Sequence, residues 1–447
     1  MFTRVLVANR GEIAVRVIRA LHELGIEAVA VYSTADESSL HVRMADHAVC
    51  IGPPSARESY LRISNLVAAA ETTGCQAVHP GYGFLAENPA FVAACVDNDL
   101  VFVGPPADVM ATMGDKIAAK QAMREADVPT VPGDDGATTL GDARDAAGEL
   151  GYPILLKASA GGGGKGMRLV QEPNELEDAF ATAASEAQAA FGDATLYVEK
   201  ALVPARHVEI QVLCDDFGNV LTLGERECSI QRRHQKLIEE SPSAALTPAA
   251  REEMEAAAER ACLAVGYRNA GTFEFLLGSD GSFYFIELNA RLQVEHPVTE
   301  LCTGIDLVRE QLRIAAGEPL TVTGRAPRRG HAIEMRLNAE DPEFDFLPSP
   351  GRISLFKAPQ GPGVRIDTFL ESGASIPPYY DSLVAKLVVW DSDRPAAIAR
   401  AERALRETVI VGVPTTRDLA LEVLASEPFR SGEYSTSTLE AIREARP

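Results

Sequence analysis

The sequence feature that most constrains the fold is a pair of short alternating segments on either side of Asp280-Gly281. Residues 271–289 read GTFEFLLGSDGSFYFIELN, and an Asp-Gly dipeptide between such runs is a strong signal for a β-hairpin with a two-residue loop. In that register Glu274 lies directly opposite Glu287, with Cβ atoms about 4.5 to 5.5 Å apart. The same register pairs Leu276 with Phe285 and Ser279 with Ser282. The segment therefore predicts an antiparallel sheet in which two like charges face each other.

Two facing glutamates repel each other unless a cation lies between them. Asn289 follows Glu287 by two residues and adds an amide oxygen to the same face of the strand. Two carboxylates and an amide form an all-oxygen site suited to Mg²⁺ or Mn²⁺, ions that commonly bridge the phosphates of a substrate. The segment thus predicts a metal site at Glu274, Glu287 and Asn289. The alternative is a pair of solvated glutamates on an outward sheet face.

The alternation continues through Arg291, Gln293 and Glu295, so we expect a single strand to carry all three. Arginine offers a planar fork for a small carboxylate-like anion, and a glutamate held ionised by that charge can accept a proton. For Glu295 the alternative is a plain ion pair.

Two more strands are expected to have one polar face. In RHVEIQV the residues His207, Glu209 and Gln211 alternate with apolar residues, and in HAIEMRL Arg336 follows Glu334 by two residues. Such faces can meet a ligand. For Arg336 the alternative is an ion pair with Glu334 on the same strand, and for His207 it is a satisfied structural histidine.

A glycine-rich segment, YPILLKASAGGGGKGMRLV at residues 152–170, allows three interpretations. A phosphate-binding P-loop is excluded because Met167 follows Gly166 where the pattern needs other residues. The dinucleotide pattern GxGxxG matches at Gly161, Gly163 and Gly166, but a strand-like run follows instead of a helix.

The third interpretation is a hairpin with a mobile glycine loop. Glycines let the backbone approach a ligand closely and direct several N–H groups at its oxygens, as a polyphosphate requires. Lys157 and Lys165 add positive charge. We therefore interpret the loop as a lid over phosphates, with an idle flexible loop as the alternative.

The order of segments predicts three parts, a doubly wound α/β part followed by two α+β parts. The strand RVLVAN, the helix RGEIAVRVIRALHELG and the strand EAVAVYS open a parallel-sheet domain at 1–113. A helix near DKIAAKQAMREA and antiparallel strands indicate a second region with its own core at 114–330, including a lid subdomain at about 131–203. Residues 331–447 form the third part.

Composition limits the possible partners. The formal charge of −22 over 447 residues argues against binding nucleic acid or an anionic membrane, and no stretch is long and apolar enough for a signal peptide or a membrane span. We expect a cytoplasmic protein. The seven cysteines lack CxxC spacing and are expected to be reduced. Of only eight lysines, Lys120, Lys357 and Lys386 are interpreted as ordinary surface lysines.

The motifs together resemble one family. KASAGGGGKGMR, VEKAL, RHVEIQVL, RECSIQRRHQKLIEESPS, FIELNARLQVEHPVTE and EMRLNAEDP follow the order seen in biotin carboxylase, an ATP-grasp ligase, and the similarity spans nearly the whole chain. The resemblance implies the following site: Lys116, Lys157, Gly163, Gly164, Lys165 and Gly166 at the ATP phosphates; Glu199, Lys200 and Leu202 at adenine; His207, Gln231 and His234 elsewhere on the nucleotide; Glu274, Glu287 and Asn289 at Mg²⁺ or Mn²⁺; Lys236, Arg291, Gln293 and Val294 at bicarbonate; Glu295 as general base; Arg336 at the biotin oxyanion; and Tyr82 at biotin.

The implied reaction is ATP-dependent carboxylation of biotin through carboxyphosphate. No lysine lies between two methionines, as a biotin-bearing motif requires, so biotin is expected on a separate carrier protein. The resemblance further implies carboxyltransferase partners, a homodimer, and a role as a free-standing subunit of an acetyl-CoA or related acyl-CoA carboxylase. Two alternatives are another ATP-grasp ligase that delivers an acyl phosphate to an amine, and a silent nucleotide-binding regulator. The latter is disfavoured because Lys236, Arg291 and Glu295 are all present.

Overall fold

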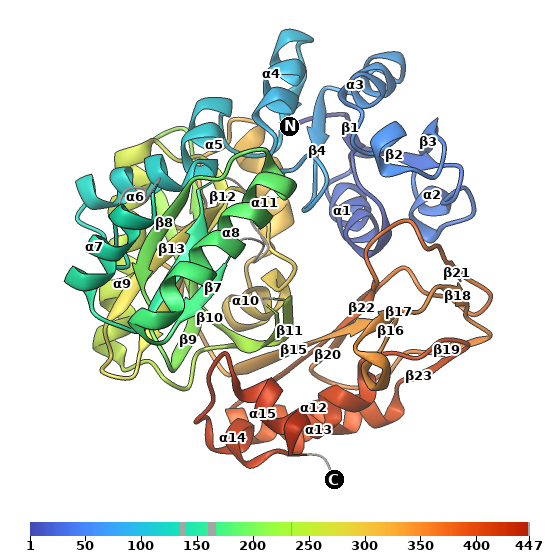
Figure 1. Cartoon of the computed structure of the whole chain (residues 1–447). Helices are drawn as coiled ribbons and strands as arrows, with labels where there is room; N and C mark the ends of the chain where they lie inside the picture. Colours follow the sequence, from blue (N-terminus) through green and yellow to red (C-terminus); the bar gives the residue numbers. More distant parts are fainter. Residues whose placement is uncertain (135–138, 160–166, 234, 446–447) are drawn as a thin grey trace.

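The computed structural model describes residues 1–134, 139–159, 167–233 and 235–445 of the chain. The ribbon view shows three regions: the N-terminal part, a large middle part, and the C-terminal part beneath them (Figure 1). None of the helices in the described ranges combines the length and the apolar character that a bilayer crossing requires.

The N-terminal part is a parallel five-stranded sheet of order β3-β2-β1-β4-β5 with helices around it. Its first three elements coincide with the predicted strand, helix and strand. The bounds are β1 Arg4–Val7, α1 Gly11–Glu23, β2 Glu27–Ser33, α2 Leu40–Met44, β3 His47–Gly52, α3 Ile63–Thr72, β4 Ala77–His79, α4 Pro89–Asp97, β5 Val101–Phe102 and α5 Ala107–Gly114.

A small three-stranded antiparallel sheet, β7-β6-β8, contains the two strands expected beside the glycine loop. Their pairing confirms the hairpin strands, whereas the loop at 160–166 lies outside the described residues. The bounds are α6 Lys116–Glu125, α7 Leu140–Leu150, β6 Ile154–Ala158, β7 Arg168–Val170, α8 Leu176–Phe191 and β8 Leu196–Lys200.

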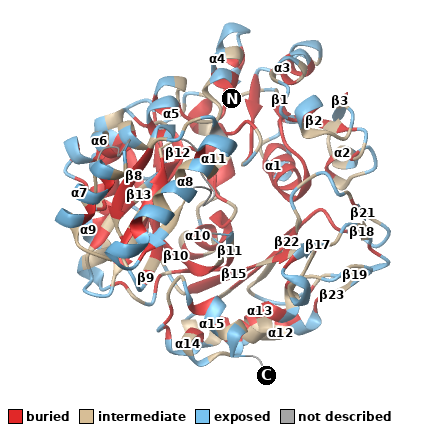
Figure 2. Cartoon of the chain, viewed as in Figure 1, coloured by how far each residue is buried: buried red, intermediate tan, exposed pale blue. Residues whose placement is uncertain are grey.

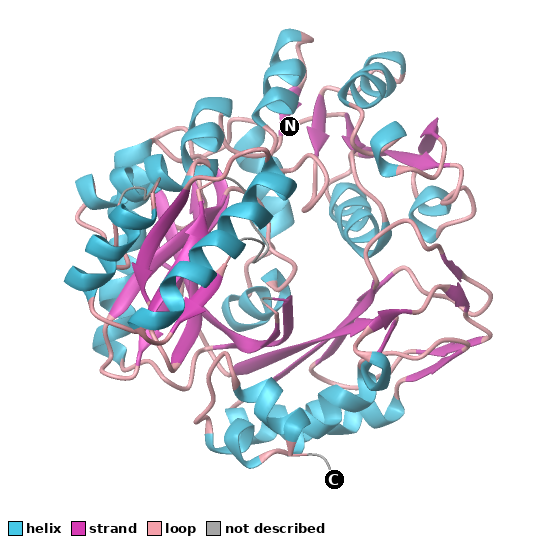
Figure 3. Cartoon of the chain, viewed as in Figure 1, coloured by secondary structure: helices cyan, strands magenta, loops and turns pink. Residues whose placement is uncertain are grey.

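The largest sheet has nine strands and runs through the rest of the molecule (Figure 3). Its main order is β13-β12-β9-β10-β11-β15-β22-β20, and β14 pairs with β10. The bounds are β9 Ala205–Cys214, β10 Val220–Arg232, β11 Gln235–Ser241, β12 Asn269–Gly278, β13 Phe283–Asn289, β14 Gly324–Arg325, β15 His331–Asn338, β20 Val364–Thr368 and β22 Leu383–Asp391. Because β11 pairs with β15, the sheet continues across residue 330.

Helices cover this sheet, and short strand pairs extend the C-terminal part. The helices are α9 Pro248–Val265, α10 His296–Thr303, α11 Leu307–Ala315, α12 Arg394–Glu407, α13 Arg417–Ala425, α14 Glu427–Ser431 and α15 Thr438–Glu444. The short strands are β16 Glu340–Asp341, β17 Leu347–Pro348, β18 Gly351–Arg352, β19 Leu355–Lys357, β21 Ser375–Ile376 and β23 Val409–Val411. Figure 2 shows that strand residues are mostly buried and that exposed residues lie on the outer sides of the helices.

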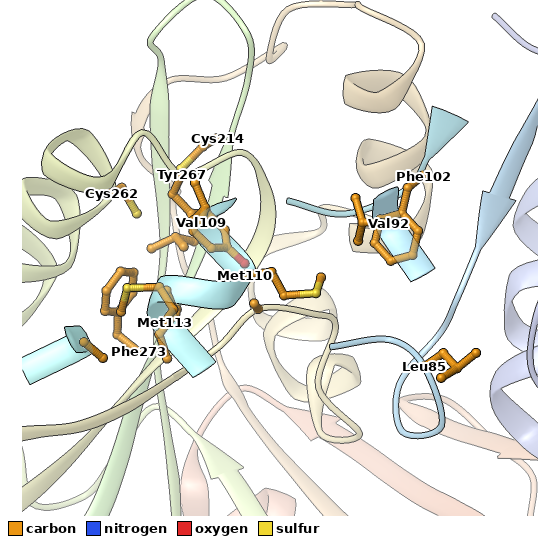
Figure 4. Packing of buried hydrophobic residues seen from close by; sticks show 14 of the residues in the cluster. Leu85, Val92, Phe102, Val109, Met110, Met113, Cys214, Cys262, Tyr267 and Phe273 are labelled. Atoms are coloured by element: carbon orange, nitrogen blue, oxygen red, sulfur yellow. The ribbon is translucent and has the colours of Figure 1, made fainter. Parts of the chain in front are cut away.

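The hydrophobic clusters cross the expected boundary near residue 113, although two smaller clusters lie wholly between residues 143 and 198. The largest cluster joins Phe102 of β5 and Val92 of α4 to Phe273 of β12. Figure 4 shows Met110 of α5 between Val92 and Phe102 on one side and Tyr267 and Phe273 on the other. The helix that ends the N-terminal part therefore packs against both regions.

The hairpin between β12 and β13 differs in register from the prediction at its tip. Leu276 pairs with Tyr284 and not with Phe285, because the loop is one residue longer than expected. A register shift between Glu274 and Phe275 then compensates for this offset, and Glu274 does lie opposite Glu287. A β-bulge of this kind adds one unpaired residue to one strand. The prediction that Glu274 lies opposite Glu287 is confirmed, whereas the predicted pairing of Leu276 with Phe285 is wrong.

Candidate active site

The central helix α10 begins at the point where the candidate residues meet, and it packs on β10, β11, β15 and β22. Glu295 is its N-cap residue and is completely buried. The expected continuation of β13 through 291–295 is therefore wrong: the strand ends at Asn289, and a short turn leads into the helix. Pro297 lies in the first turn of the helix, where its fixed φ and missing N–H are tolerated.

Two cations from different strands hold the Glu295 carboxylate. Lys236 Nζ donates to Oε1 at 2.6 Å, and Arg336 Nη2 donates to Oε2 at 2.9 Å. Burial acts to raise the pKa of Glu295, but the charges of Lys236 and Arg336 outweigh it and hold that pKa well below its ordinary value. The carboxylate is therefore ionised, as an acceptor of a proton must be.

Lys236 also joins Glu295 to two other carboxylates. Its ammonium donates to Glu209 at 2.7 Å and to Glu274 at 2.9 Å. Glu209 was predicted only as part of a polar strand face, and it is completely buried against Arg226, whose Nε donates to it at 2.5 Å. The polar face of β9 is thus confirmed, and the opposite face packs into the core.

Arg291 lies beside this cluster and is held by Glu87, a residue that the sequence did not single out. Arg291 Nε donates to Glu87 at 2.8 Å, and Nη2 donates to Asn289 Oδ1 at 2.9 Å. Gln293 accepts from Arg291 Nη1 at 3.2 Å. The only sequence signal for Glu87 is its position after β4, because parallel sheets gather functional residues at the carboxyl ends of their strands.

The candidate metal ligands lie together at the end of the β12–β13 hairpin. Glu274 accepts from Asn289 Nδ2 at 2.9 Å, and His207 Nε2 lies 3.0 Å from its other oxygen. Glu287 is exposed and has no ion pair or hydrogen bond among the residues that the structure describes. An unpaired carboxylate facing a second carboxylate, with an amide beside it, fits a hard divalent cation by its donor set. His207 is itself affected: burial opposes its charged form, but Glu274 outweighs burial and raises the pKa of His207.

The lysines expected at phosphates converge on Glu199. Lys157 Nζ lies 2.5 Å from Glu199 Oε2, and Lys120 forms an ion pair with Oε1. Lys120 is buried, so its interpretation as a surface lysine is wrong. Lys116 begins α6 close to Lys157 and Glu287; burial lowers the pKa of Lys116, and the two neighbours act on it in opposite directions.

The other residues expected at the nucleotide lie on or beside two sheets, the β7-β6-β8 sheet and the nine-stranded sheet. Lys200 donates to the carbonyls of Gly151 and Tyr152 at 3.0 and 3.1 Å, and Leu202 is half-buried. Gln231 is buried and pairs with Lys236 across β10 and β11. The remaining expected residues lie outside the described residues: Gly163, Gly164, Lys165, Gly166 and His234.

Lys386 is the second lysine misjudged from sequence, since its side chain is completely buried. It pairs with Arg336 across β15 and β22. Its ammonium donates to the Val294 carbonyl at 2.9 Å and lies 3.2 Å from Glu12, which accepts a hydrogen bond from the Tyr82 hydroxyl. Lys386 thus connects the segment expected at bicarbonate to the residue expected at biotin. The sequence signal for a buried Lys386 was its position as the only charge inside the apolar run LVAKLVVW. A charge in a buried strand needs an ion partner. Lys357 is exposed, as expected.

Arg336 does not form the alternative ion pair with Glu334. Its guanidinium binds Glu239 of β11 at 2.5 Å as well as Glu295. Arg336 therefore bridges two elements and faces the candidate base.

Comparison with known proteins places these residues in a family. Consecutive family models match the chain: Biotin carboxylase, N-terminal domain, at 1–110; Carbamoyl-phosphate synthase L chain, ATP binding domain, at 115–323; and Biotin carboxylase C-terminal domain at 334–441. The Biotin carboxylase of Nostoc sp. (strain PCC 7120) is 52% identical over 99% of this chain and 100% of its own length. The chain belongs to the biotin carboxylase family.

Relatives with other names and solved structures are also similar to this chain. A pyruvate carboxylase subunit from Methanothermobacter thermautotrophicus is 52% identical over 99% of this chain and 90% of its own length. A biotin carboxylase complex from Campylobacter jejuni has a TM-score of 0.96 at 47% identity, covering 99% of both chains. The biotin carboxylase domain dimer of Hydrogenobacter thermophilus 2-oxoglutarate carboxylase, with MgADP and bicarbonate, has a TM-score of 0.95 at 47% identity, covering 99% of this chain and 98% of that chain. These likenesses confirm the family, its ATP-dependent ligase class and the three-part α/β and α+β architecture.

Proposed function

We propose that this protein carboxylates N1′ of biotin at the expense of ATP, with carboxyphosphate as the intermediate. The observation that carries the proposal is the buried Glu295 carboxylate held between Lys236 at 2.6 Å and Arg336 at 2.9 Å. One cation belongs to the bicarbonate side of the site and the other to the biotin side. A base placed between them can serve a reaction that joins these two substrates.

In the first step Glu295 removes the proton of bicarbonate, which Lys236, Arg291, Gln293 and Val294 hold. The low pKa of Glu295 makes it a weak base while both cations bind it. Bound bicarbonate interacts with the Lys236 ammonium, and bound biotin interacts with the Arg336 guanidinium. Each interaction weakens the contact of that cation with Glu295, so the proton affinity of Glu295 rises when both substrates are bound. The base is therefore strongest in the complete complex.

The deprotonated bicarbonate oxygen attacks the γ-phosphorus of ATP. Lys116 and Lys157 supply positive charge for the transferring group, and we propose that the glycine loop and Lys165 add backbone and side-chain donors. Glu274, Glu287 and Asn289 are the proposed ligands of Mg²⁺ or Mn²⁺, which would neutralise phosphate charge there. Glu199, Lys200, Leu202, His207, Gln231 and His234 are proposed to bind the rest of the nucleotide.

In the second step carboxyphosphate separates into CO₂ and phosphate, and phosphate takes the N1′ proton of biotin. Arg336 stabilises the negative ureido oxygen while N1′ attacks CO₂, and Tyr82 contacts the biotin ring. Without biotin, water consumes carboxyphosphate and ADP forms without carboxybiotin. The two outcomes separate the bicarbonate half of the reaction from the biotin half.

We further propose that biotin arrives on a separate carrier protein, that the enzyme acts as a homodimer, and that carboxyltransferase subunits pass the carboxyl group to an acyl-CoA. The dimer is supported by the Hydrogenobacter relative, whose biotin carboxylase domain is a dimer. Relatives named for pyruvate and 2-oxoglutarate carboxylases make an oxo acid the alternative acceptor. Incubating carboxylated carrier with candidate carboxyltransferases and each acceptor distinguishes the two.

The test of the main proposal is ADP release by purified protein with Mg²⁺ and bicarbonate, with and without free biotin, for wild type and Glu295→Gln. We expect biotin to stimulate turnover, turnover to require bicarbonate, and the variant to lose both. Ammonia-dependent turnover without biotin stimulation would indicate another ligase. ATP binding without turnover would indicate a silent nucleotide-binding protein.

A further inference from the structure

The main sheet contains a second pair of facing glutamates, separate from the candidate metal ligands. Glu239 of β11 lies directly opposite Glu334 of β15. Both side chains are completely buried. Residues directly opposite in an antiparallel pair have Cβ atoms about 4.5 to 5.5 Å apart. Two buried carboxylates at this separation oppose each other's ionisation, so a proton on one of them stabilises the arrangement.

The hydrogen bonds of the pair are unequal and indicate where that proton lies. Glu239 Oε1 accepts from Arg336 Nε at 2.5 Å. In the described ranges no donor reaches Glu239 Oε2 or either oxygen of Glu334. A buried ionised carboxylate without donors is strongly unfavourable, whereas a carboxyl group tolerates such a site and has a proton of its own to donate. The proton therefore belongs on Glu334 and the negative charge on Glu239.

The surrounding charges support this assignment. Burial raises the pKa of Glu239 to about 7 against the opposing charge of Arg336, and burial raises the pKa of Glu334 well above its ordinary value despite Lys386. The charged and titratable groups facing the pair are Lys236 of β11, Arg336 of β15, Lys386 of β22, Cys228 of β10 and Glu295 at α10.

We propose that Glu239 and Glu334 together hold one proton and that ionised Glu239 is a positioning residue, which orients Arg336 for the biotin half of the reaction. This inference rests on the proposed function.

The geometry of the guanidinium explains the role. Glu239 binds Nε and lies 2.5 Å from Nη2, and Glu295 also binds Nη2, while Nη1 has no hydrogen-bond partner among the described residues. Because Nε and Nη2 of Arg336 are held by carboxylates, Nη1 remains to meet the ureido oxygen of biotin. Glu334 lies two residues from Arg336 on the same face of β15. If Glu334 were ionised it would compete with Glu239 and Glu295 for the guanidinium, and its proton removes that competition.

The first experiment locates the proton by infrared spectroscopy at neutral pH. We expect the spectrum of wild type minus Glu334→Gln to contain the carbonyl band of a protonated carboxyl group, shifted in D₂O. Glu240→Gln is the matched control: Glu240 is the next residue of β11 and equally buried, but binds Arg394 and His331 and has a pKa lowered to about 2. Its difference spectrum should contain only lost carboxylate bands. A Glu334→Gln difference spectrum without the protonated band would overturn the proton assignment.

The second experiment measures positioning as a ratio: biotin-dependent ADP formation divided by bicarbonate-dependent ADP formation without biotin. Glu239→Gln should lower this ratio at least about tenfold with an unchanged KM for ATP, because Arg336 loses one of its two anchors and Lys236 still holds Glu295. Glu239→Asp keeps the charge and should recover part of the ratio. We also expect the ratio to fall in wild type below about pH 7, where Glu239 gains a proton, and to lose that dependence in Glu239→Gln.

The control Glu240→Gln should keep the wild-type ratio even if its melting temperature falls. If both activities of Glu239→Gln fall together with the folded fraction, Glu239 has only a structural role and the positioning proposal is wrong. A wild type without biotin-stimulated turnover would overturn the proposed function, and the infrared comparison would still decide where the proton lies.

Discussion

At the scale of single residues, side chains from the N-terminal and C-terminal parts hold the charged groups of the site. Glu87 follows β4 and fixes Arg291, and Lys386 of β22 fixes the Val294 carbonyl from the opposite side. Neither residue needs to touch a substrate. Both set the direction of the segment that precedes Glu295.

Glu87→Gln should weaken bicarbonate binding selectively. The Glu87 carboxylate accepts from Arg291 Nε at 2.8 Å and from the Ala290 amide at 3.0 Å. Because this ion pair is partly exposed, we expect the KM for bicarbonate to rise only about threefold to tenfold, equivalent to ~0.7–1.4 kcal/mol. Steady-state kinetics with bicarbonate and ATP varied in turn provides the measurement. An equal rise in the KM for ATP would contradict a local effect.

Lys386→Met should be destabilising, by about 3 kcal/mol in urea unfolding, because it leaves Glu12 buried without its cation, whereas Asp367 keeps Arg365. Glu12→Gln in the same chain removes the Glu12 charge and should restore part of the stability. Two single effects that simply add would show that Lys386 and Glu12 are not coupled.

Lys120 and Lys386 also show the limit of sequence interpretation at this scale. The pattern LVAKLVVW placed a charge inside an apolar strand, but its partner Glu12 belongs to a different part of the chain. Lys120 likewise pairs with Glu199 of another element. Alternation indicates which face a residue occupies and says nothing about an ion partner that only tertiary folding brings near.

At the scale of elements, β11 separates two functions on its two faces. Glu239 faces Arg336, whereas Glu240 faces His331, Arg394 and Tyr434. One face therefore serves the proposed site, and the other attaches the C-terminal helices to the sheet.

Glu240→Gln should change the acid stability of the protein. Burial would raise the pKa of Glu240, but the hydrogen bond and charge of His331, together with Arg394, lower it from 4.5 to about 2. A lowered folded-state pKa stabilises the protein above the unfolded value, and this contribution disappears as pH falls from about 4.5 to about 2. It amounts to roughly 3 kcal/mol. The difference between the unfolding free energies of wild type and variant should shrink over this range; parallel curves would refute the assignment.

The boundaries of helices and strands could be predicted from the sequence only where the local signal was strong. Strong periodicity defined β1, α1 and β2, and Asp280-Gly281 located the hairpin. The bulge beside Glu274 was not predictable, because one unpaired residue leaves the apolar and polar composition of both strands unchanged. The residues from Arg291 to Glu295 alternate as in a strand but form a turn. The sequence signal against a strand there was Pro297, because proline is common in the first turn of a helix.

At the scale of the whole molecule, one carboxylate joins all three parts of the chain. Glu300 of α10 binds Arg16 of α1 at 3.0 Å and Arg365 of β20 at 2.6 Å. All three side chains are largely shielded from water. Burial would raise the pKa of Glu300, but the two arginines hold it well below its ordinary value. The parts are thus connected by charge as well as by shared hydrophobic cores.

Glu300→Gln should cost about 3 kcal/mol, because Arg16 and Arg365 lose their shared anion and keep Asp306 and Asp367, respectively. We also expect the wild type to unfold in one transition and the variant in more than one, which calorimetry detects when the van't Hoff enthalpy becomes smaller than the calorimetric enthalpy. Glu371→Gln is the control: its ion pair with Arg43 also joins distant parts of the chain but is exposed, so its effect should stay below about 1 kcal/mol. Similar losses in both variants would show that the burial of Glu300 is unimportant.

The pairing of β11 with β15 also has a consequence during synthesis on the ribosome. The edge of β11 is complete when residue 241 emerges, but its partner strand begins only at residue 331, roughly 90 residues later. For that interval the nascent chain presents an unpaired edge beside a hydrophobic core that is only partly assembled. We expect the charged side chains Glu239 and Glu240 on that edge to disfavour pairing with a neighbouring nascent chain while translation is unfinished.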